Sequence, residues 1–232
     1  MTIKANKPSA FTLIELLVVI AIIAILAAFA VPALTSALAK GQMTGTMNNA
    51  RQLYIAQFQM SNDGAATGDA TSAWPGDLPV VPGTLEAYLN VLLGKGYLKG
   101  ADALKLLSAP GANLVGNITP AGTANPESIT LTAGKSALKV YLVQDSNPAT
   151  TIFACTQNYV YDTALAGANQ PYGTKGFIVV KKGGDAAIFR EGQATTAGWT
   201  SPVIFQTQIG MKPGDTEGNV AAGDPATTLK YP

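Results

Sequence analysis

The sequence has no histidine, a single cysteine and few charged residues, and each shortage excludes a class of function. Histidine is the commonest general base and metal ligand, so Ser–His–Asp and Cys–His catalysis cannot occur within this chain. Cys155 cannot form an intramolecular disulfide, and no basic residue lies near it in sequence to activate its thiol. Charged residues make up 12% of the chain and the formal net charge is +1, so we expect no nucleic-acid partner. We expect a protein that is not an enzyme.

An apolar segment near the N-terminus is long enough to cross a membrane. Residues 16–39 carry no charge. As a helix they would span about 36 Å at about 1.5 Å per residue, more than the hydrocarbon core of about 30 Å. Lys4 and Lys7 precede this run without any acid, and such basic flanks stay cytoplasmic. We therefore expect the C-terminal bulk of the chain outside the cytoplasm.

Glu15 opens this apolar run, and three interpretations compete. In a plain signal anchor the carboxylate would snorkel to the headgroups. In a cleaved secretory signal, Ala28-Phe29-Ala30 has the small-x-small form of a cleavage site, although the run is too long for the apolar part of such a signal. A carboxylate deep in a membrane helix costs on the order of 2.5–3.5 kcal/mol, less near the end. A plain anchor has no use for a carboxylate that carries this cost. The third interpretation is therefore that Glu15 has a function of its own in the protein.

The segment Ala10-Phe11-Thr12-Leu13-Ile14-Glu15, followed by Leu16-Leu17-Val18-Val19-Ile20, resembles the processing site of type IV prepilins and pseudopilins. The resemblance implies that a membrane aspartic peptidase cuts between Ala10 and Phe11 and that the new terminus is methylated. Ala10 stands where the family usually has glycine, so we expect slower cleavage. Glu15 matches the near-terminal glutamate of the family, and Pro32 matches its helix-kinking proline.

The resemblance gives Glu15 a partner. A buried carboxylate must be neutralised or paired, and the amine of Phe11 on a neighbouring subunit would pair with it. Only a subunit in register satisfies both charges, so Glu15 would act as a register check in assembly. Pro32 removes one helix hydrogen bond and predicts a kink or a melted stretch. Gly41 and Gly45 add further weak points to the helix.

Beyond the apolar run, the pattern predicts that the helix continues with one apolar face. Apolar residues recur three or four apart up to Phe58, and Asn62-Asp63-Gly64 has the composition of a helix end. We predict a leader at 1–10, a helix at 11–62 with its transmembrane part at about 13–34, and an extracytoplasmic domain at 63–232. The fold class is α+β, with the long helix packed on an antiparallel sheet, as in pilins.

Within the predicted domain, two short helices precede the strands. Thr84 would cap a helix at 85–93, a second helix is predicted at 101–107, and 64–83 and 111–125 read as loops. Strand composition appears at 128–132, 137–143 and 151–161. Gly183-Gly184-Asp185 predicts a hairpin between 177–182 and 186–190, and 203–208 is predicted as a last strand.

Three carboxylates in the Gly-rich tail, Asp215, Glu217 and Asp224, form the only metal hypothesis. Some pseudopilins bind calcium in a C-terminal loop, and oxygen ligands suit that ion. The spacing matches no EF-hand, so a solvated acidic loop is the alternative. No cofactor is required.

These observations predict a structural subunit of a type IV pilus-like filament or a type II secretion pseudopilus. Its partners would be copies of itself, other pilin-like subunits, prepilin peptidase and an inner-membrane assembly platform. It would reside in a bacterial inner membrane, with the domain in the periplasm and the filament there or at the cell surface. Two alternatives stay open: a signal-anchored binding protein using loops around Trp74 or Trp199, and a secreted hydrolase beginning at Val31.

Overall fold

The computed structural model describes residues 12–123 and 125–231. The chain divides into two compact units, Met1–Gly41 and Gln42–Pro232. Helix α1 (Leu13–Thr67) runs from the first unit into the second. The predicted limits of leader and domain stay predictions, but the predicted α+β fold class, with a long N-terminal helix and an antiparallel sheet region, is confirmed.

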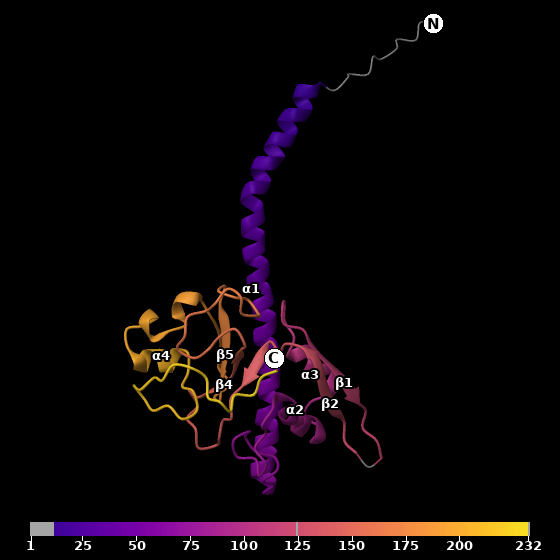
Figure 1. Cartoon of the computed structure of the whole chain (residues 1–232), viewed down its shortest axis with the longest axis vertical. Coiled ribbons are helices and arrows are strands. Elements are labelled where there is room, and N and C mark those ends of the chain that lie inside the picture. Colours follow the sequence, from indigo (N-terminus) through magenta and orange to yellow (C-terminus); the bar gives the residue numbers. More distant parts are fainter. Residues whose placement is uncertain (1–11, 124, 232) are drawn as a thin grey trace. The chain divides into compact units, whose positions relative to one another are not determined.

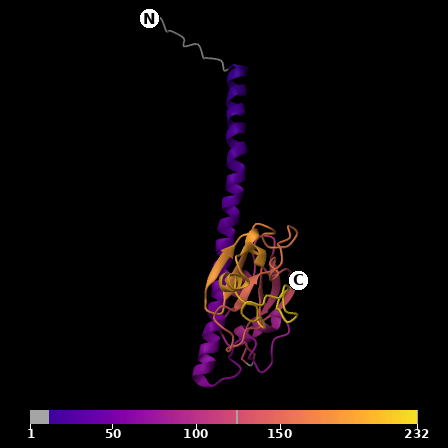
Figure 2. The ribbon, with the colours of Figure 1, turned by 90° about the vertical axis from the view of Figure 1, so that its left-hand side faces the viewer.

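In the second unit, the last part of α1 lies between two groups of elements (Figure 1). In the perpendicular view of Figure 2, most of both groups lie on the same side of this segment. The helix therefore buries one face against them and leaves the other face exposed. The first group holds α2 (Leu85–Gly94), α3 (Gly100–Leu106) and the antiparallel pair of β1 (Leu114–Thr119) and β2 (Ser128–Gly134). The second is an antiparallel sheet in the order β3-β4-β5-β6, made of β3 (Leu138–Val140), β4 (Ile152–Thr156), β5 (Phe177–Lys181) and β6 (Ala186–Phe189).

Two 3₁₀ turns, Glu191–Gln193 and Thr196–Gly198, follow the sheet, and helix α4 (Pro202–Gln208) comes after them. The predicted strand at 203–208 is therefore wrong. Ser201 caps the helix by accepting a hydrogen bond from the Ile204 amide at 3.2 Å, and Pro202 occupies the first turn. A serine cap followed by proline is a helix-start signal, and it outweighs the strand preference of Val203 and Ile204.

Helix α1 ends later than predicted, because it continues through Asn62-Asp63-Gly64 to Thr67. Gly68 then adopts a φ of 72°, and the Asp69 amide donates to the Gly64 carbonyl at 3.0 Å. This is the hydrogen bond of a Schellman cap, in which a glycine in the left-handed conformation ends the helix. Gly64 sits inside the last turns because the Ser72 backbone packs directly against its Cα.

The loop predicted at 111–125 is wrong, because strand β1 lies within it although Gly116 and Asn117 are poor strand residues. Pairing with β2 overrides this local preference, with Ile118 opposite Ile129 and a register shift at Val115/Gly116. The hairpin of β5 and β6 is confirmed, with Gly184 at a φ of 90° and the Lys181 amide donating to the Asp185 carbonyl at 2.8 Å. Helix α2 begins as predicted, with the Thr84 hydroxyl accepting from the Ala87 amide at 3.1 Å.

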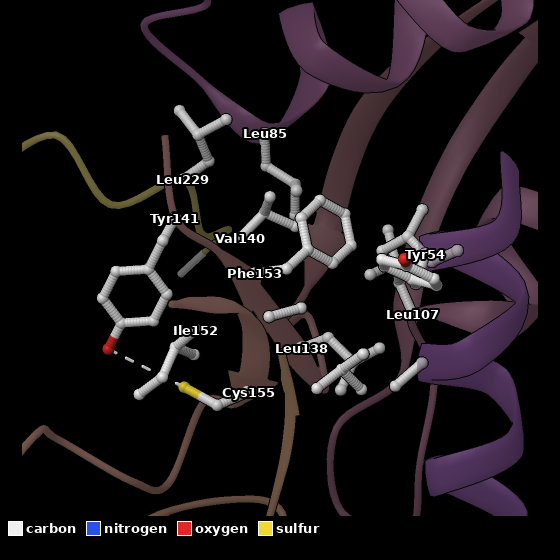
Figure 3. Packing of buried hydrophobic residues seen from close by; sticks show 14 of the residues in the cluster. Tyr54, Leu85, Leu107, Leu138, Val140, Tyr141, Ile152, Phe153, Cys155 and Leu229 are labelled. Carbon is white, nitrogen blue, oxygen red and sulfur yellow. Dashed lines mark hydrogen bonds between the residues drawn. The ribbon is translucent and has the colours of Figure 1, made fainter. Parts of the chain in front are cut away.

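The core of the second unit joins α1 to the sheet (Figure 3). Tyr54 from α1 packs edge-on against Phe153 of β4, with ring centroids 5.8 Å apart. Leu138 and Val140 of β3 are fully buried in the same cluster, and Cys155, also fully buried, lies beside Tyr141. Leu229 of the C-terminal tail covers the edge of β3 by exchanging two backbone hydrogen bonds with Val140, at 2.8 and 2.9 Å. The tail is therefore part of the folded domain.

Candidate functional site

The first turn of α1 is closed by a capping box that contains Glu15. The Thr12 amide and hydroxyl both donate to Glu15 Oε2 at 2.8 Å, and the Glu15 amide donates to the Thr12 hydroxyl at 3.3 Å. The two residues satisfy each other's otherwise unpaired helix-end groups. The carboxylate also lies at the positive end of the helix dipole. Ala10 and Phe11, the predicted cleavage and methylation residues, lie outside the described residues.

After Glu15, the part of α1 that lies in the first unit exposes apolar side chains on every face. Within the described residues, α1 is the one helix long and apolar enough to cross a membrane, with a mean hydropathy of 3.0 over its best window. No residue of that window is buried inside the protein. A helix that is apolar all round must bury itself in protein or lipid. The chain therefore has a candidate membrane anchor, and Glu15 lies at its N-terminal end.

Pro32 lies inside α1 without interrupting its helical assignment. The Thr35 hydroxyl donates to the Pro32 carbonyl at 2.9 Å, which supports the backbone beside the proline. The helix is also continuous through Gly41 and Gly45. In this single chain no stretch is melted at Pro32, and the kink stays a prediction.

The alternative of a signal-anchored binding protein depends on Trp74 and Trp199, and both side chains contact the rest of the domain. Trp74 is 5% exposed and packs against Tyr54, Phe58 and Phe153 at centroid distances of 6.3, 6.4 and 6.1 Å. Trp199 is half-buried, and its Nε1 donates to the Gln193 carbonyl at 3.0 Å. Both rings therefore help to stabilise the fold, and the half-buried Trp199 keeps part of its surface accessible.

Cys155 lies in the interior of β4, fully buried. Burial raises the pKa of its thiol to about 12. The thiol donates to the Tyr141 hydroxyl at 3.8 Å, a contact seen in Figure 3. A neutral, enclosed thiol is a poor nucleophile, so the residue is structural.

We expect Cys155 to resist thiol reagents in the folded protein. At pH 8, Ellman's reagent should modify it at least about a hundredfold more slowly than in the guanidinium-unfolded chain, because the thiolate is disfavoured and access is blocked. The time course of absorbance with and without denaturant measures this ratio. Rapid modification of the native chain would show that β4 opens or that the thiol is activated.

The three tail carboxylates have different surroundings. Asp224 accepts hydrogen bonds from the Tyr141 hydroxyl at 2.7 Å and the Tyr161 amide at 3.2 Å, and its other oxygen binds the Lys139 ammonium. Asp215 lies 3.7 Å from Lys212 Nζ, and burial raises its pKa. Glu217 is exposed. Among the described residues, no three His, Cys, Asp or Glu side chains lie close enough to hold a metal ion, so these three do not form one ligand set.

A melting experiment distinguishes calcium binding by the tail from a solvated acidic loop. Both carboxylate oxygens of Asp224 already accept hydrogen bonds, one from the Lys139 ammonium and one from the Tyr141 hydroxyl. We therefore expect EDTA to leave the thermal midpoint of the detergent-solubilised chain unchanged. A midpoint that falls in EDTA and recovers with added calcium, but not with magnesium, would show that the tail binds the ion.

Two side-chain partners in the structure were not predicted from the sequence. Thr12 was not recognised as the partner of Glu15, although Thr12-Leu13-Ile14-Glu15 has the spacing of a capping box. The Lys139–Asp224 ion pair joins residues 85 positions apart, and no local pattern marks it. The alternative cleavage segment, Ala28-Phe29-Ala30, lies within the continuous helix.

The comparisons with known proteins bear on the N-terminal residues. Residues 5–31 match the family model described as the prokaryotic N-terminal methylation motif. The match includes Ala10, Phe11 and Glu15 and ends just before Pro32. No curated protein and no solved structure matches the chain. The motif supports a pilin-like substrate of prepilin peptidase, and the apolar helix beside it supports membrane anchoring. The chain carries the N-terminal signature of type IV pilins and pseudopilins.

Proposed function

We propose that this chain is a structural subunit of a type IV pilus-like filament or a type II secretion pseudopilus, which polymerises through α1 after cleavage and methylation at Phe11. The observation that carries the proposal is the position of Glu15. It is the one acidic residue of the first unit, and it lies in the first turn of an exposed apolar helix, within the matched motif. An anchor alone would use that carboxylate only to cap the helix.

The capping box shows how the free subunit tolerates Glu15. Before assembly, the Thr12 amide and hydroxyl satisfy the carboxylate locally. Cleavage before Phe11 would create a charged amine one residue ahead of Thr12. In a polymer that amine, brought by the neighbouring subunit, would approach Glu15 in a water-poor environment, where an unpaired charge is costly. Only the correct axial register pairs the two charges.

The apolar helix supplies the packing surface. Helices leaving lipid for a filament exchange lipid contacts for helix contacts, so association depends on close packing and polar pairs and gains little from apolar burial alone. The domain would then lie outside the cytoplasm and form the outer shell of the polymer. Prepilin peptidase, an inner-membrane assembly platform and further pilin-like subunits are the partners that this function requires.

Processing at Ala10 tests the proposal. Ala10→Gly should raise the rate at which the precursor is converted to the mature form, by about threefold or more, because glycine removes the remaining side chain at the cleaved bond. Pulse–chase labelling in a host with prepilin peptidase measures the conversion.

Ala28→Gly is the matched control, since it makes the same change at the alternative secretory site. We expect it to leave conversion unchanged. A product that begins at Val31, or a conversion rate that responds to Ala28 and ignores Ala10, would contradict the proposal and favour a secreted protein.

A further inference from the structure

The second unit has an acidic pocket at the end where α1 finishes. The pocket has a volume of about 400 Å³ and lies between the last turns of α1, the segment around Trp74, and Asp145 in the loop between β3 and β4. Ala65, Ala70 and Ala73 contribute apolar lining, and Asp77 and Asp145 contribute carboxylates. The pocket is therefore apolar inside and acidic at its rim.

The rim carboxylates differ in how far they are neutralised. Asp69, which also lines the pocket, is paired with Lys95 at 2.7 Å. Asp77 Oδ2 accepts a hydrogen bond from the Asp145 amide at 2.5 Å, which fixes the two residues beside each other. The Asp145 side chain is 89% exposed, and its nearest cation, Lys182 Nζ, lies 3.8 Å away. Lys182 is itself bound to the backbone carbonyls of Asp145 and Asn147. Asp145 thus presents an accessible carboxylate over the pocket.

The opposite end of the unit is basic. Tyr172 anchors the segment before β5 to the beginning of this part of α1, through a contact of 2.7 Å with the Thr46 hydroxyl and a bond of 3.1 Å to the Gln42 carbonyl. Lys175 follows on that segment and is exposed. Strand β6 ends beside the start of β5, since Phe189 pairs with Phe177, so Arg190 lies at the same end.

The two ends are well separated. Thr46 lies at the basic end of α1 and Gly64 at the pocket, and the eighteen residue steps from one to the other span about 27 Å of helix. Within the part of the chain that the structure describes, Lys175 and Arg190 form no ion pair, although Glu191 follows Arg190 in sequence. The basic end therefore offers two cations without an ion pair among the described residues, and the pocket offers Asp77 together with the exposed Asp145, whose ion pair with Lys182 is long at 3.8 Å.

We propose that the acidic pocket of one copy binds the basic end of a second copy, with Lys175 of the second copy beside Asp145 and Asp77 of the first. This inference rests on the proposed function. Copies inserted with the same topology pack in parallel, and parallel copies displaced along the axis bring unlike ends together. Such a heterologous contact builds an open helical polymer. A lysine suits the mouth of the pocket because its ammonium can lie beside the rim carboxylates while its alkyl stem covers neighbouring apolar surface.

Cysteine cross-linking of the full-length chain tests the contact directly. The only native cysteine is buried, so introduced cysteines dominate the reaction. We expect Asp145→Cys and Lys175→Cys to give disulfide-linked dimers when the two variants are co-expressed and oxidised, and none when either is expressed alone. A chain carrying both changes should give a ladder of oligomers. The control chain carries Asp145→Cys together with Asn117→Cys, an exposed position on β1, and it should give no ladder.

Charge reversal supplies a second test that does not depend on disulfide geometry. Asp145→Lys and Lys175→Glu should each lower the yield of sedimentable polymer by about threefold, and the double variant should restore it. Both residues are exposed, Asp145→Lys also breaks the pair with Lys182, and the rescue by the double variant excludes that loss and misfolding as the cause.

The outcomes separate this inference from the proposed function. Processed polymer that forms without the cross-link and ignores both charge reversals would overturn the inference and leave the proposed function intact. Dimers from one single-cysteine variant alone would show a like-to-like contact and overturn the head-to-tail arrangement. A processed wild-type chain that forms no polymer would overturn both.

Discussion

Replacing Asp224 by alanine is expected to destabilise the domain by about 3–5 kcal/mol, because it strands a buried cation. The Lys139 side chain is 1% exposed, and Asp224 is the acid that pairs with it. Asp224 also receives the Tyr141 hydroxyl at 2.7 Å and the Tyr161 amide at 3.2 Å. Without the carboxylate, Lys139 would keep the Tyr159 carbonyl and the Tyr141 ring as partners but no counter-charge, and the Tyr141 hydroxyl and Tyr161 amide would lose their acceptor. Denaturant unfolding of the detergent-solubilised chain, followed by circular dichroism, measures the loss.

Two variants separate the ion pair from other effects of the mutation. Glu217→Ala removes an exposed carboxylate from the same tail and should change stability by less than about 0.5 kcal/mol. Combining Lys139→Met with Asp224→Leu replaces the whole pair by apolar side chains, and we expect it to cost less than Asp224→Ala alone. An Asp224→Ala variant as stable as the parent would mean that water solvates Lys139, and that the ion pair does not hold the tail against β3.

Glu15→Gln is expected to lower polymer yield by at least about tenfold while the precursor is still inserted and processed, because the neighbour's Phe11 amine loses its counter-charge. Glutamine is also accepted at this position of a capping box, so it can still receive the Thr12 amide hydrogen bond. The substitution therefore removes the charge and keeps the helix cap. The ratio of sedimentable polymer to mature subunit, measured by immunoblot, reports the effect.

Thr12→Val provides the converse control for this experiment. It removes the hydroxyl that donates to Glu15 at 2.8 Å and leaves the backbone donor and the carboxylate in place. We expect a reduction in polymer smaller than that of Glu15→Gln. If glutamine at position 15 assembles as well as glutamate, the carboxylate serves only to cap the helix, and the register check is wrong.

Local patterns in this sequence were reliable where one segment determines its own structure. The cap at Thr84 and the hairpin around Gly184 follow from short-range chemistry, and both are confirmed. Local patterns failed where two signals competed. Val203 and Ile204 favour a strand, but Ser201 and Pro202 start a helix. The end of α1 depends on Gly68, four residues beyond the turn-like Gly64.

Long-range partners could not be predicted from one sequence. Strand β1 exists because β2 pairs with it, and nothing within its own six residues indicates that partner. The ion pair of Lys139 and Asp224 depends on where the tail returns to the sheet. The candidate site at Glu15 behaves differently, since its capping partner lies three residues away and its family motif is contiguous. For this reason the N-terminal residues gave the clearest functional prediction.

The most direct test of the central proposal is the intact mass and N-terminal sequence of the protein isolated from its native host. The account predicts a chain that begins at N-methylated Phe11, ten residues shorter than the printed sequence. A chain that begins at Met1 or at Val31 would contradict it, leave Glu15 as a feature of an anchor or a secretory signal, and move the search for function to the C-terminal domain.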